Sequence, residues 1–251
     1  MTVSVVTISQ RGRFPVLKIL VKILLSQTIK PNEWVIVEGS KNEEDAKLHA
    51  EDIATIKVPF TLRYLPYEAG LKLGGLRNRG NEACKSDIIV CMDDDDFYPS
   101  DRIEHVVEQF RRNPSINIAG CSNVLLYDYS SKTMYQCIGF HGNHSTNNAM
   151  AWRSIYLKTH KHDPEKSNAE EASFTNQFVE NMIPLEPTKT VIVSSHTNNT
   201  FDKRNLIQFN PRFKVIAHSA LYAMMPEAFY QEYLEFFEKQ IQKQNEAQKS
   251  K

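Results

Sequence analysis

Four adjacent aspartates, Asp93 to Asp96, follow an apolar run at 87–92 that is typical of a buried strand. Neighbouring carboxylates repel one another unless a cation lies among them. Alternate residues at a strand end point to opposite sides, so the carboxylates can differ in role. Oxygen ligands favour Mg²⁺ or Mn²⁺ over zinc. We therefore expect a divalent cation here, and the alternative is a solvated acidic turn that caps the next helix.

His196 is a candidate for a further metal ligand, because it ends a predicted strand at 191–195 and begins a polar loop. Neutral histidine is a common metal ligand, and the alternative is a neutral histidine with a structural role. Two histidine pairs, at 141/144 and 160/162, also have ligand-like spacing. Two ligands at short range specify no third, so these pairs are weak signals.

Basic residues near glycines are the candidate phosphate contacts: Arg11 and Arg13 around Gly12, and Lys72 before Gly74 and Gly75. Backbone amides at glycines and positive side chains both suit a phosphate group. The full P-loop spacing is absent, which disfavours a P-loop kinase. Lys203 and Arg204, beyond His196, are further candidates for phosphate contacts.

The elements that must position these residues alternate through the first half of the chain, which predicts an α/β fold with a mainly parallel sheet flanked by helices. Strands are expected at 3–8, 34–38, 61–65 and 87–92, with helices at 16–27, 73–83 and 100–113. Strands and turns are expected at 116–138, then polar, histidine-rich binding loops at 143–166. A strand at 190–195 and a helix at 225–242 follow, and the polar end to 251 is expected to fray.

The composition is that of an ordinary globular protein, with 251 residues, 41% of them apolar and 24% charged. Thirty basic and thirty acidic residues cancel, so no global field draws the chain to nucleic acid. The four cysteines form no CxxC pair, which fits reduced thiols in the cytoplasm. We find no signal peptide and no apolar run of the ~20 residues that an integral membrane segment needs. A cytoplasmic, single-domain protein is therefore expected.

Four blocks, at 3–10, 34–40, 76–80 and 90–96, resemble the motifs of glycosyltransferase family 2 and follow their order. The resemblance implies a GT-A fold in one domain, with donor-binding residues in 1–100, acceptor-binding residues in 101–225, and a C-terminal helix and tail in 226–251. The compact chain also looks like the small glycosyltransferases of large DNA viruses, which implies the host cytoplasm.

By position in those blocks, the resemblance assigns the donor nucleotide to Ser9, Glu38, Arg77, Asn78, Asp93 and Asp94, with Arg11 as an added phosphate contact. It assigns the metal to Asp95, with Asp93 and His196 as further ligands. The chain departs from the family's D-D turn, because Val37 and Glu38 occupy those two positions.

A second match lies downstream, where 148–153 resembles the segment before the family's acceptor loop and Ala169-Glu170-Glu171 resembles its G-E-D motif. The resemblance implies that Glu171 is the base that takes a proton from the acceptor hydroxyl, with Glu170 as the alternative. Acidic residues also suit the first turn of a helix, so two solvated glutamates are the competing interpretation.

These observations together favour a metal-dependent, inverting glycosyltransferase that uses Mn²⁺ or Mg²⁺ and a nucleotide-sugar donor, with a UDP-sugar preferred by family frequency. The acceptor is a glycan or another hydroxyl compound. A nucleotidyltransferase or metal-dependent phosphohydrolase is the alternative enzyme. A non-catalytic binding domain is the third hypothesis, and it predicts that Glu170 and Glu171 lie away from the aspartates.

Overall fold

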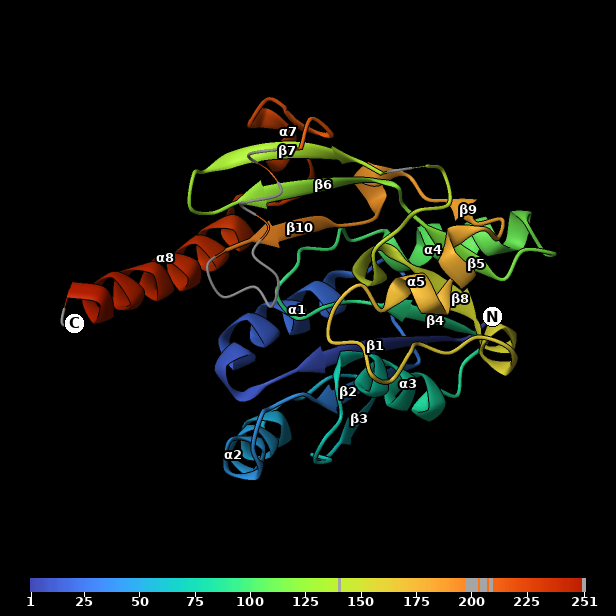
Figure 1. Cartoon of the computed structure of the whole chain (residues 1–251), viewed down its shortest axis with the longest axis horizontal. Helices are drawn as coiled ribbons and strands as arrows, with labels where there is room; N and C mark the ends of the chain where they lie inside the picture. Colours follow the sequence, from blue (N-terminus) through green and yellow to red (C-terminus); the bar gives the residue numbers. More distant parts are fainter. Residues whose placement is uncertain (140, 197–202, 204–206, 208–209, 250–251) are drawn as a thin grey trace.

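The computed structural model describes residues 1–139, 141–196, 203, 207 and 210–249. They form one α/β domain with two sheets and with helices packed against them, as Figure 1 shows. None of the helices in these ranges is long and apolar enough to cross a membrane. Arg204, a candidate phosphate contact, and residues 197–200 of the polar loop after His196 lie outside the described residues.

The larger sheet has seven strands in the order β3-β2-β1-β4-β8-β5-β9. Its first half is parallel, as predicted, and comprises β3 (Thr61–Leu65), β2 (Glu33–Glu38), β1 (Val3–Ser9) and β4 (Ile88–Cys91). The second half is mixed, because β8 (Ala151–Arg153) runs antiparallel between β4 and β5 (Ile118–Gly120), and β5 pairs in parallel with β9 (Ile183–Pro184). The prediction of an α/β fold with helices around a mainly parallel sheet is confirmed.

Helices cover both faces of this sheet, because its strands are apolar on both sides. In sequence order they are α1 (Phe14–Ser26) after the short η1 (Arg11–Arg13), α2 (Glu43–Ala54), α3 (Leu73–Ala83) and α4 (Arg102–Arg112). Residues of α1 and α4 share one apolar core with Val3 and Val5, and α3 packs on the opposite face. A side chain at Gly80 of α3 would collide with Val6 and Val37, so glycine lets the helix approach the sheet closely.

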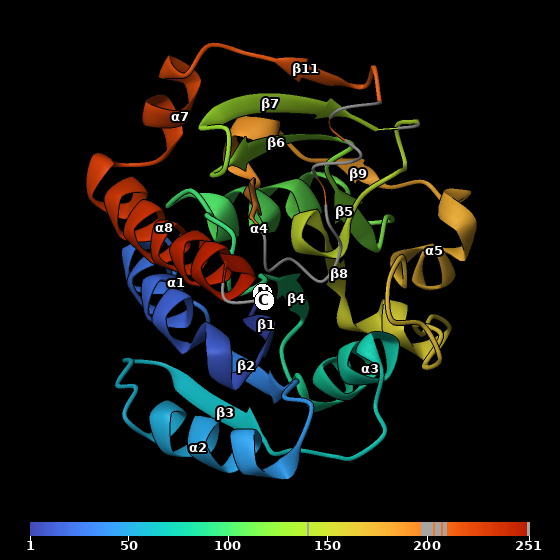
Figure 2. The ribbon, with the colours of Figure 1, turned by 60° about the vertical axis from the view of Figure 1, so that its left-hand side comes forward.

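A second sheet has the order β10-β6-β7-β11 and lies above the first in Figure 1. It contains β6 (Asn123–Asp128), β7 (Thr133–Ile138), β10 (Ile192–Ser195) and β11 (Phe213–Val215). The helices α7 (Ser219–Met224) and α8 (Glu227–Lys249) follow, and α8 runs beside α1 (Figure 2). A bridge between Phe97 and Ile192 ties the aspartate turn to this sheet.

Two expectations for the second half of the chain are wrong. Residues 143–166 contain the buried strand β8 as well as loops, because Trp152 is fully buried and pairs with both β4 and β5. Short 3₁₀ turns, η2 (Asn147–Ala149) and η3 (Ser154–Lys158), flank that strand. The final helix continues through Lys249 instead of fraying after 242. Between β8 and β10 lie α5 (Glu171–Phe174), η4 (Asn176–Phe178) and η5 (Pro187–Lys189).

Candidate active site

Many of the candidate polar residues meet in a cavity of about 620 Å³ at the carboxyl ends of β1 and β4. Parallel strands present these ends on the same edge of the sheet, which is where α/β sheets bind ligands. Its lining includes Ser9, Arg13, Lys41, Arg77, Asp93, Asp95, Asp96, Asn148 and Lys203. Four of the predicted site residues therefore lie at one cavity: Ser9, Arg77, Asp93 and Asp95.

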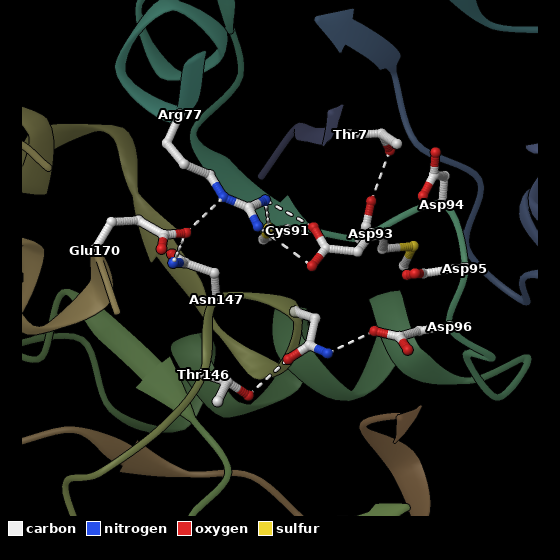
Figure 3. Close-up of polar contacts among 12 residues, drawn as sticks. Thr7, Arg77, Cys91, Asp93, Asp94, Asp95, Asp96, Thr146, Asn147 and Glu170 are labelled. Carbon is white, nitrogen blue, oxygen red and sulfur yellow. Dashed lines mark hydrogen bonds and ion pairs between the residues drawn. The ribbon is translucent and has the colours of Figure 1, made fainter. Parts of the chain in front are cut away.

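Asp93 faces Arg77, which lies between two carboxylates (Figure 3). Arg77 Nη1 donates to Asp93 Oδ1 at 2.7 Å, and Nη2 donates to Oδ2 at 3.2 Å. On its other side, Arg77 Nε donates to Glu170 Oε1 at 3.2 Å. A guanidinium in two such contacts is fixed in orientation, because its donors form a rigid fork. Arg77 therefore presents a positive charge at a fixed place on the cavity wall.

Asp94 and Asp95 share one cation, Arg13. Arg13 Nη1 lies 2.9 Å from Asp94 Oδ1 and 3.1 Å from Asp95 Oδ2. Burial raises the pKa of Asp94 to about 6, against the opposing charge of Arg13. Burial would also raise the pKa of Asp95, but Arg13 and His196 outweigh it and hold that pKa well below its usual range. Asp95 therefore ionises at lower pH than Asp94 does.

Asp96 lines the cavity and is held by Asn148 and Ser194. Asn148 Nδ2 donates to its Oδ2 at 2.5 Å, and the backbone N–H of Ser194 donates to its Oδ1 at 2.7 Å. Burial and the charge of Asp95 raise the pKa of Asp96 to about 7. Because Asp94, Asp95 and Asp96 are all buried, the alternative of a solvated acidic turn is wrong.

His196 follows β10 and is buried against Asp95. Its Nε2 lies 3.2 Å from Asp95 Oδ2, and its ring stacks on Phe237 of α8 with centroids 4.1 Å apart. Burial lowers the pKa of His196, although Asp95 opposes this shift. The ring is therefore neutral near pH 7, which is the form that binds metal.

No group of three or more His, Cys, Asp or Glu side chains able to hold a metal ion occurs in the described part of the chain. Asp95 and His196 nevertheless present an oxygen and a nitrogen to each other across 3.2 Å. Mg²⁺ is commonly held by one or two protein carboxylates together with substrate phosphates. The residues thus fit an ion that a bound diphosphate helps to hold, and they do not form a closed cage.

Glu170 lies across Arg77 from Asp93, and neither Glu170 nor its neighbour Glu171 lines the cavity. Glu170 is buried, and its Oε1 accepts from Asn147 Nδ2 at 2.9 Å as well as from Arg77. Glu171 begins α5, and its carboxylate accepts from its own backbone N–H. Burial and the charge of Glu170 raise the pKa of Glu171 to about 7. Because Arg77 and Asp93 also act on this pKa, the two glutamates and the aspartates share one electrostatic cluster.

Three predicted donor residues have partners elsewhere in the protein. The Glu38 carboxylate is buried and accepts from Ser40 N–H, His49 Nδ1 and Tyr64 OH, at 2.7, 2.7 and 2.6 Å. Arg11 pairs with Asp52 of α2 at 2.5 Å and does not line the cavity. Asn78 clamps the backbone of His162, donating to its oxygen at 2.8 Å and accepting from its N–H at 2.9 Å.

The Gly74-Gly75 segment also has a structural explanation. A side chain at Gly74 would lie 2.0 Å from the backbone oxygen of Asp163, so glycine lets this loop pack on the start of α3. Lys72 pairs with Glu165 of the same loop at 2.7 Å. By contrast Lys203 lines the cavity, and its Nζ donates to Ser194 O at 2.9 Å.

Sequence reasoning missed the roles of Asn147 and Asn148. Asn147 contacts Glu170, and Asn148 contacts Asp96 and lines the cavity. The available signal was position, since Asn147 precedes the 148–153 block, Asn148 begins it, and the short turn η2 brings both to buried carboxylates. The second half of the chain thus supplies the polar partners of the first.

Ala169 has a left-handed backbone, with φ at 50°. The family motif has glycine at this position, and alanine in this conformation costs ~1–2 kcal/mol. We expect Ala169→Gly to raise the free energy of unfolding by ~0.5–1 kcal/mol, because the relief of strain exceeds the entropy that glycine adds to the unfolded chain. Urea unfolding measures the change. Ala172→Gly, inside α5, is the control and should lower stability by ~1 kcal/mol; a loss of stability in both variants would contradict the strain.

Comparison with known proteins agrees with this geometry. The model of the family described as Glycosyl transferase family 2 matches residues 4–175. No curated protein sequence matches the chain. The fold is similar to S. aureus TarS 1-349 in complex with UDP-GlcNAc, with TM-score 0.57 and 13% identity over 79% of this chain and 60% of that chain. It is also similar to mannosyltransferase PcManGT from Pyrobaculum calidifontis in complex with GDP-Man and Mn²⁺. The TM-score is 0.57 and the identity 12%, over 82% of this chain and 60% of that chain.

The chain spans about 60% of the length of these solved structures, and at such low identity the likeness concerns the fold. The family match is of a different kind, because it rests on the sequence and includes the aspartate cluster, Arg77 and the glutamate pair. It favours glycosyl transfer over the nucleotidyltransferase and phosphohydrolase alternatives. Since this match covers more than half of the chain, the protein belongs to glycosyltransferase family 2.

Proposed function

We propose that the protein transfers a sugar from a nucleotide diphosphate sugar, preferably a UDP-sugar, to a hydroxyl acceptor with inversion at the anomeric carbon. The observation that carries this proposal is the position of Arg77, fixed between Asp93 and Glu170 on the wall of the cavity. Similar folds have been solved with UDP-GlcNAc and with GDP-Man, which supports a nucleotide-sugar donor.

In this proposal the donor diphosphate lies in the cavity near Arg77, Arg13 and Lys203, all of which line it. Negative charge develops on the diphosphate as the glycosidic bond breaks, and fixed positive groups stabilise that charge. A bound Mn²⁺ or Mg²⁺, held by Asp95 with His196 beside it, would add Lewis-acid stabilisation. Ser9 and Asp93 would contact the nucleotide from the ends of β1 and β4.

Four predicted donor residues do not line the cavity, and we assign them no direct contact with the donor: Arg11, Glu38, Asn78 and Asp94. Glu38 orders the turn after β2 by accepting from the Ser40 N–H. Asp94 anchors Arg13, which does face the cavity. We propose that these residues shape the donor site and do not themselves bind the nucleotide.

The base in the proposed reaction is Glu171. Inverting displacement needs a group that accepts the proton of the attacking hydroxyl, and such a group works best with a pKa near the working pH. The pKa of Glu171, raised by burial to about 7, meets this requirement. Glu170 fits the role less well, because its carboxylate already accepts from Arg77 and Asn147.

The test is a panel of UDP-, GDP- and other nucleotide sugars, assayed for Mn²⁺-dependent binding by calorimetry and for release of the nucleotide diphosphate. NMR of the anomeric proton in the product reports inversion or retention. Binding of no nucleotide sugar, with or without metal, would contradict the proposal. A cytoplasmic location, in the host cytoplasm if the chain is viral, and acceptor binding by 101–225 belong to the same proposal.

The buried aspartates predict that metal stabilises the protein more at high pH. The pKa values of Asp94 and Asp96, about 6 and about 7, lie above the ~3.9 of an exposed aspartate, so the fold binds protons more tightly than the unfolded chain does. Their contribution to stability is therefore full below pH ~4 and is lost as pH rises through 6 to 7. We expect Mg²⁺ to raise the melting temperature more at pH 8 than at pH 5.5, because ionised carboxylates attract it.

Differential scanning fluorimetry with and without Mg²⁺ measures this difference. Asp96→Asn is the matched variant, since the amide keeps the shape of the side chain but cannot ionise. It should flatten the pH dependence of the melting temperature. An equal Mg²⁺ effect at both pH values would contradict the prediction.

A further inference from the structure

Asn147 connects the glutamate of the site to a buried histidine. Its Nδ2 donates to Glu170 Oε1 at 2.9 Å, and its Oδ1 lies 3.0 Å from His162 Nε2. Because the amide nitrogen faces a carboxylate, the amide oxygen is left to accept. His162 must then carry its proton on Nε2. The contact thus fixes the tautomer of His162 as well as the orientation of the Asn147 amide.

His162 is held so that this proton points at Asn147. Its ring stacks on Phe174 of α5, with centroids 4.1 Å apart and planes 5° apart. Its backbone is clamped by Asn78 of α3. Burial and the charge of Arg77 lower the pKa of His162 to about 3, so the ring stays neutral. Its Nδ1 is buried without a hydrogen-bond partner in the described part of the chain, so Nε2 is the ring nitrogen that hydrogen-bonds to Asn147.

These contacts form a closed circuit of hydrogen bonds and ion pairs that begins and ends in the middle of α3. Arg77 binds Glu170, Glu170 accepts from Asn147, and Asn147 accepts from His162. His162 in turn is clamped by Asn78, the neighbour of Arg77 on the same helix. Figure 3 shows the part of the circuit in which Asn147 and Arg77 approach Glu170 from the same side. Of these five residues, Arg77 lines the cavity and the other four do not.

We propose that Asn147 and His162 are positioning residues that act through Glu170 to hold the Arg77 guanidinium toward the donor diphosphate. This inference rests on the proposed function, because it assigns Arg77 to the donor. It gives Glu170 a task distinct from proton transfer and gives Asn78 a structural one. The Glu170 carboxylate accepts from two fixed donors and so has little freedom to turn. Because Glu170 is fixed, the Arg77 guanidinium keeps the orientation in which it hydrogen-bonds to Asp93.

His162→Phe is the decisive variant, because phenylalanine keeps the flat stack on Phe174 but cannot donate to Asn147. We expect the Kd for UDP to rise about tenfold, as for loss of one hydrogen bond that supports a charged group. His162→Gln offers an amide N–H in place of Nε2 and should recover most of the affinity. His160→Phe is the matched control, since His160 pairs with Glu180 outside this circuit and its replacement should leave the Kd unchanged.

A double variant that combines His162→Phe with Arg77→Lys separates loss of Arg77 positioning from a general disturbance of the fold. Lysine keeps the charge but cannot span Asp93 and Glu170, so His162→Phe should change the Kd less than about twofold in that background. Equal effects of His162→Phe in both backgrounds would overturn the inference, as would parental affinity in the single variant. An equal loss in His160→Phe would also overturn it, because the loop and not the circuit would then be responsible.

Solvent exchange of the Arg77 Nε proton, followed by NMR and assigned through its absence in Arg77→Lys, tests the circuit without any nucleotide. We expect exchange to be slow in the parent and at least about tenfold faster in His162→Phe. If the parent binds neither UDP nor GDP, the proposed function fails. Unchanged exchange in His162→Phe would instead overturn the circuit alone.

Discussion

Glu171→Gln is expected to lower sugar transfer by about 10²–10⁴-fold while leaving donor binding at the parental level. Glutamine keeps the size of the side chain but cannot accept a proton from the acceptor. The Glu171 carboxylate accepts from its own backbone N–H, and the oxygen of glutamine can accept the same hydrogen bond, so the replacement leaves this donor paired. Steady-state kinetics and calorimetry with UDP together separate kcat from binding.

The pH profile adds a second readout. The pKa of Glu171 is raised by burial to about 7, so parental transfer should fall as pH drops through this value and the carboxylate takes up a proton. In Glu171→Gln that limb of the profile should disappear. An unchanged acidic limb would assign the titration to another group.

Glu170→Gln is the matched control for this variant, since the two residues are neighbours and the substitution is identical. Glu170 accepts from Arg77 Nε and Asn147 Nδ2, so its replacement should weaken UDP binding first. If Glu170→Gln abolishes transfer with donor binding intact and Glu171→Gln does not, the base is Glu170. If neither variant slows transfer, the proposed inverting mechanism loses its support.

The donor half of the fold could be predicted from the sequence because its signals are local. The strand at 61–65 and the helix at 73–83 have the predicted bounds, and β1, β2 and β4 differ from prediction by one or two residues. In each case an apolar run or a helical period defines the element. The carboxyl ends of parallel strands then had to meet at one edge, which brought Ser9 and Asp93 together.

The mixed part of the larger sheet, which contains β8, β5 and β9, could not be predicted in the same way. The strand β8 has three residues and owes its burial to pairing with β4 and β5, which are far away in sequence. A segment of that length has no period to detect, and its histidine-rich surroundings indicate a loop. The neighbouring turn delivers Asn147 and Asn148 to Glu170 and Asp96, so their roles depend on the same long-range pairing.

The sequence predicted which charged residues lie near the site better than it predicted which partner each side chain faces. Arg11 and Arg13 are two residues apart, yet Arg11 pairs with Asp52 of α2 while Arg13 reaches Asp94 and Asp95. Glu38 has the chemistry to bind a nucleotide, but His49 and Tyr64 already occupy its carboxylate. Which neighbour a side chain faces follows from the packing of α2 on the sheet, and the sequence carries no local signal for it.

Asp95→Asn is expected to abolish Mn²⁺-dependent nucleotide binding, with a loss in affinity for UDP and Mn²⁺ of at least about 100-fold. Asparagine keeps the shape of the side chain but lacks the negative charge of the carboxylate, which Arg13 and His196 keep ionised by lowering its pKa. Calorimetry with UDP in the presence of Mn²⁺, and again with EDTA, measures the metal-dependent part. Binding in EDTA should change little, because Arg77 and Lys203 remain in the cavity wall.

Asp94→Asn is the control that tests whether Asp95 is the ligand or only part of an acidic cluster. Both aspartates contact the same Arg13 nitrogen, at 2.9 and 3.1 Å, so the two variants disturb that arginine alike. Only Asp95 lines the cavity and faces His196, and Asp94 is fully buried behind it. A metal ligand therefore predicts loss in Asp95→Asn alone, whereas a general electrostatic effect predicts equal loss in both. Unchanged Mn²⁺ dependence in Asp95→Asn would remove Asp95 from the metal site, and with it the reason for placing His196 there.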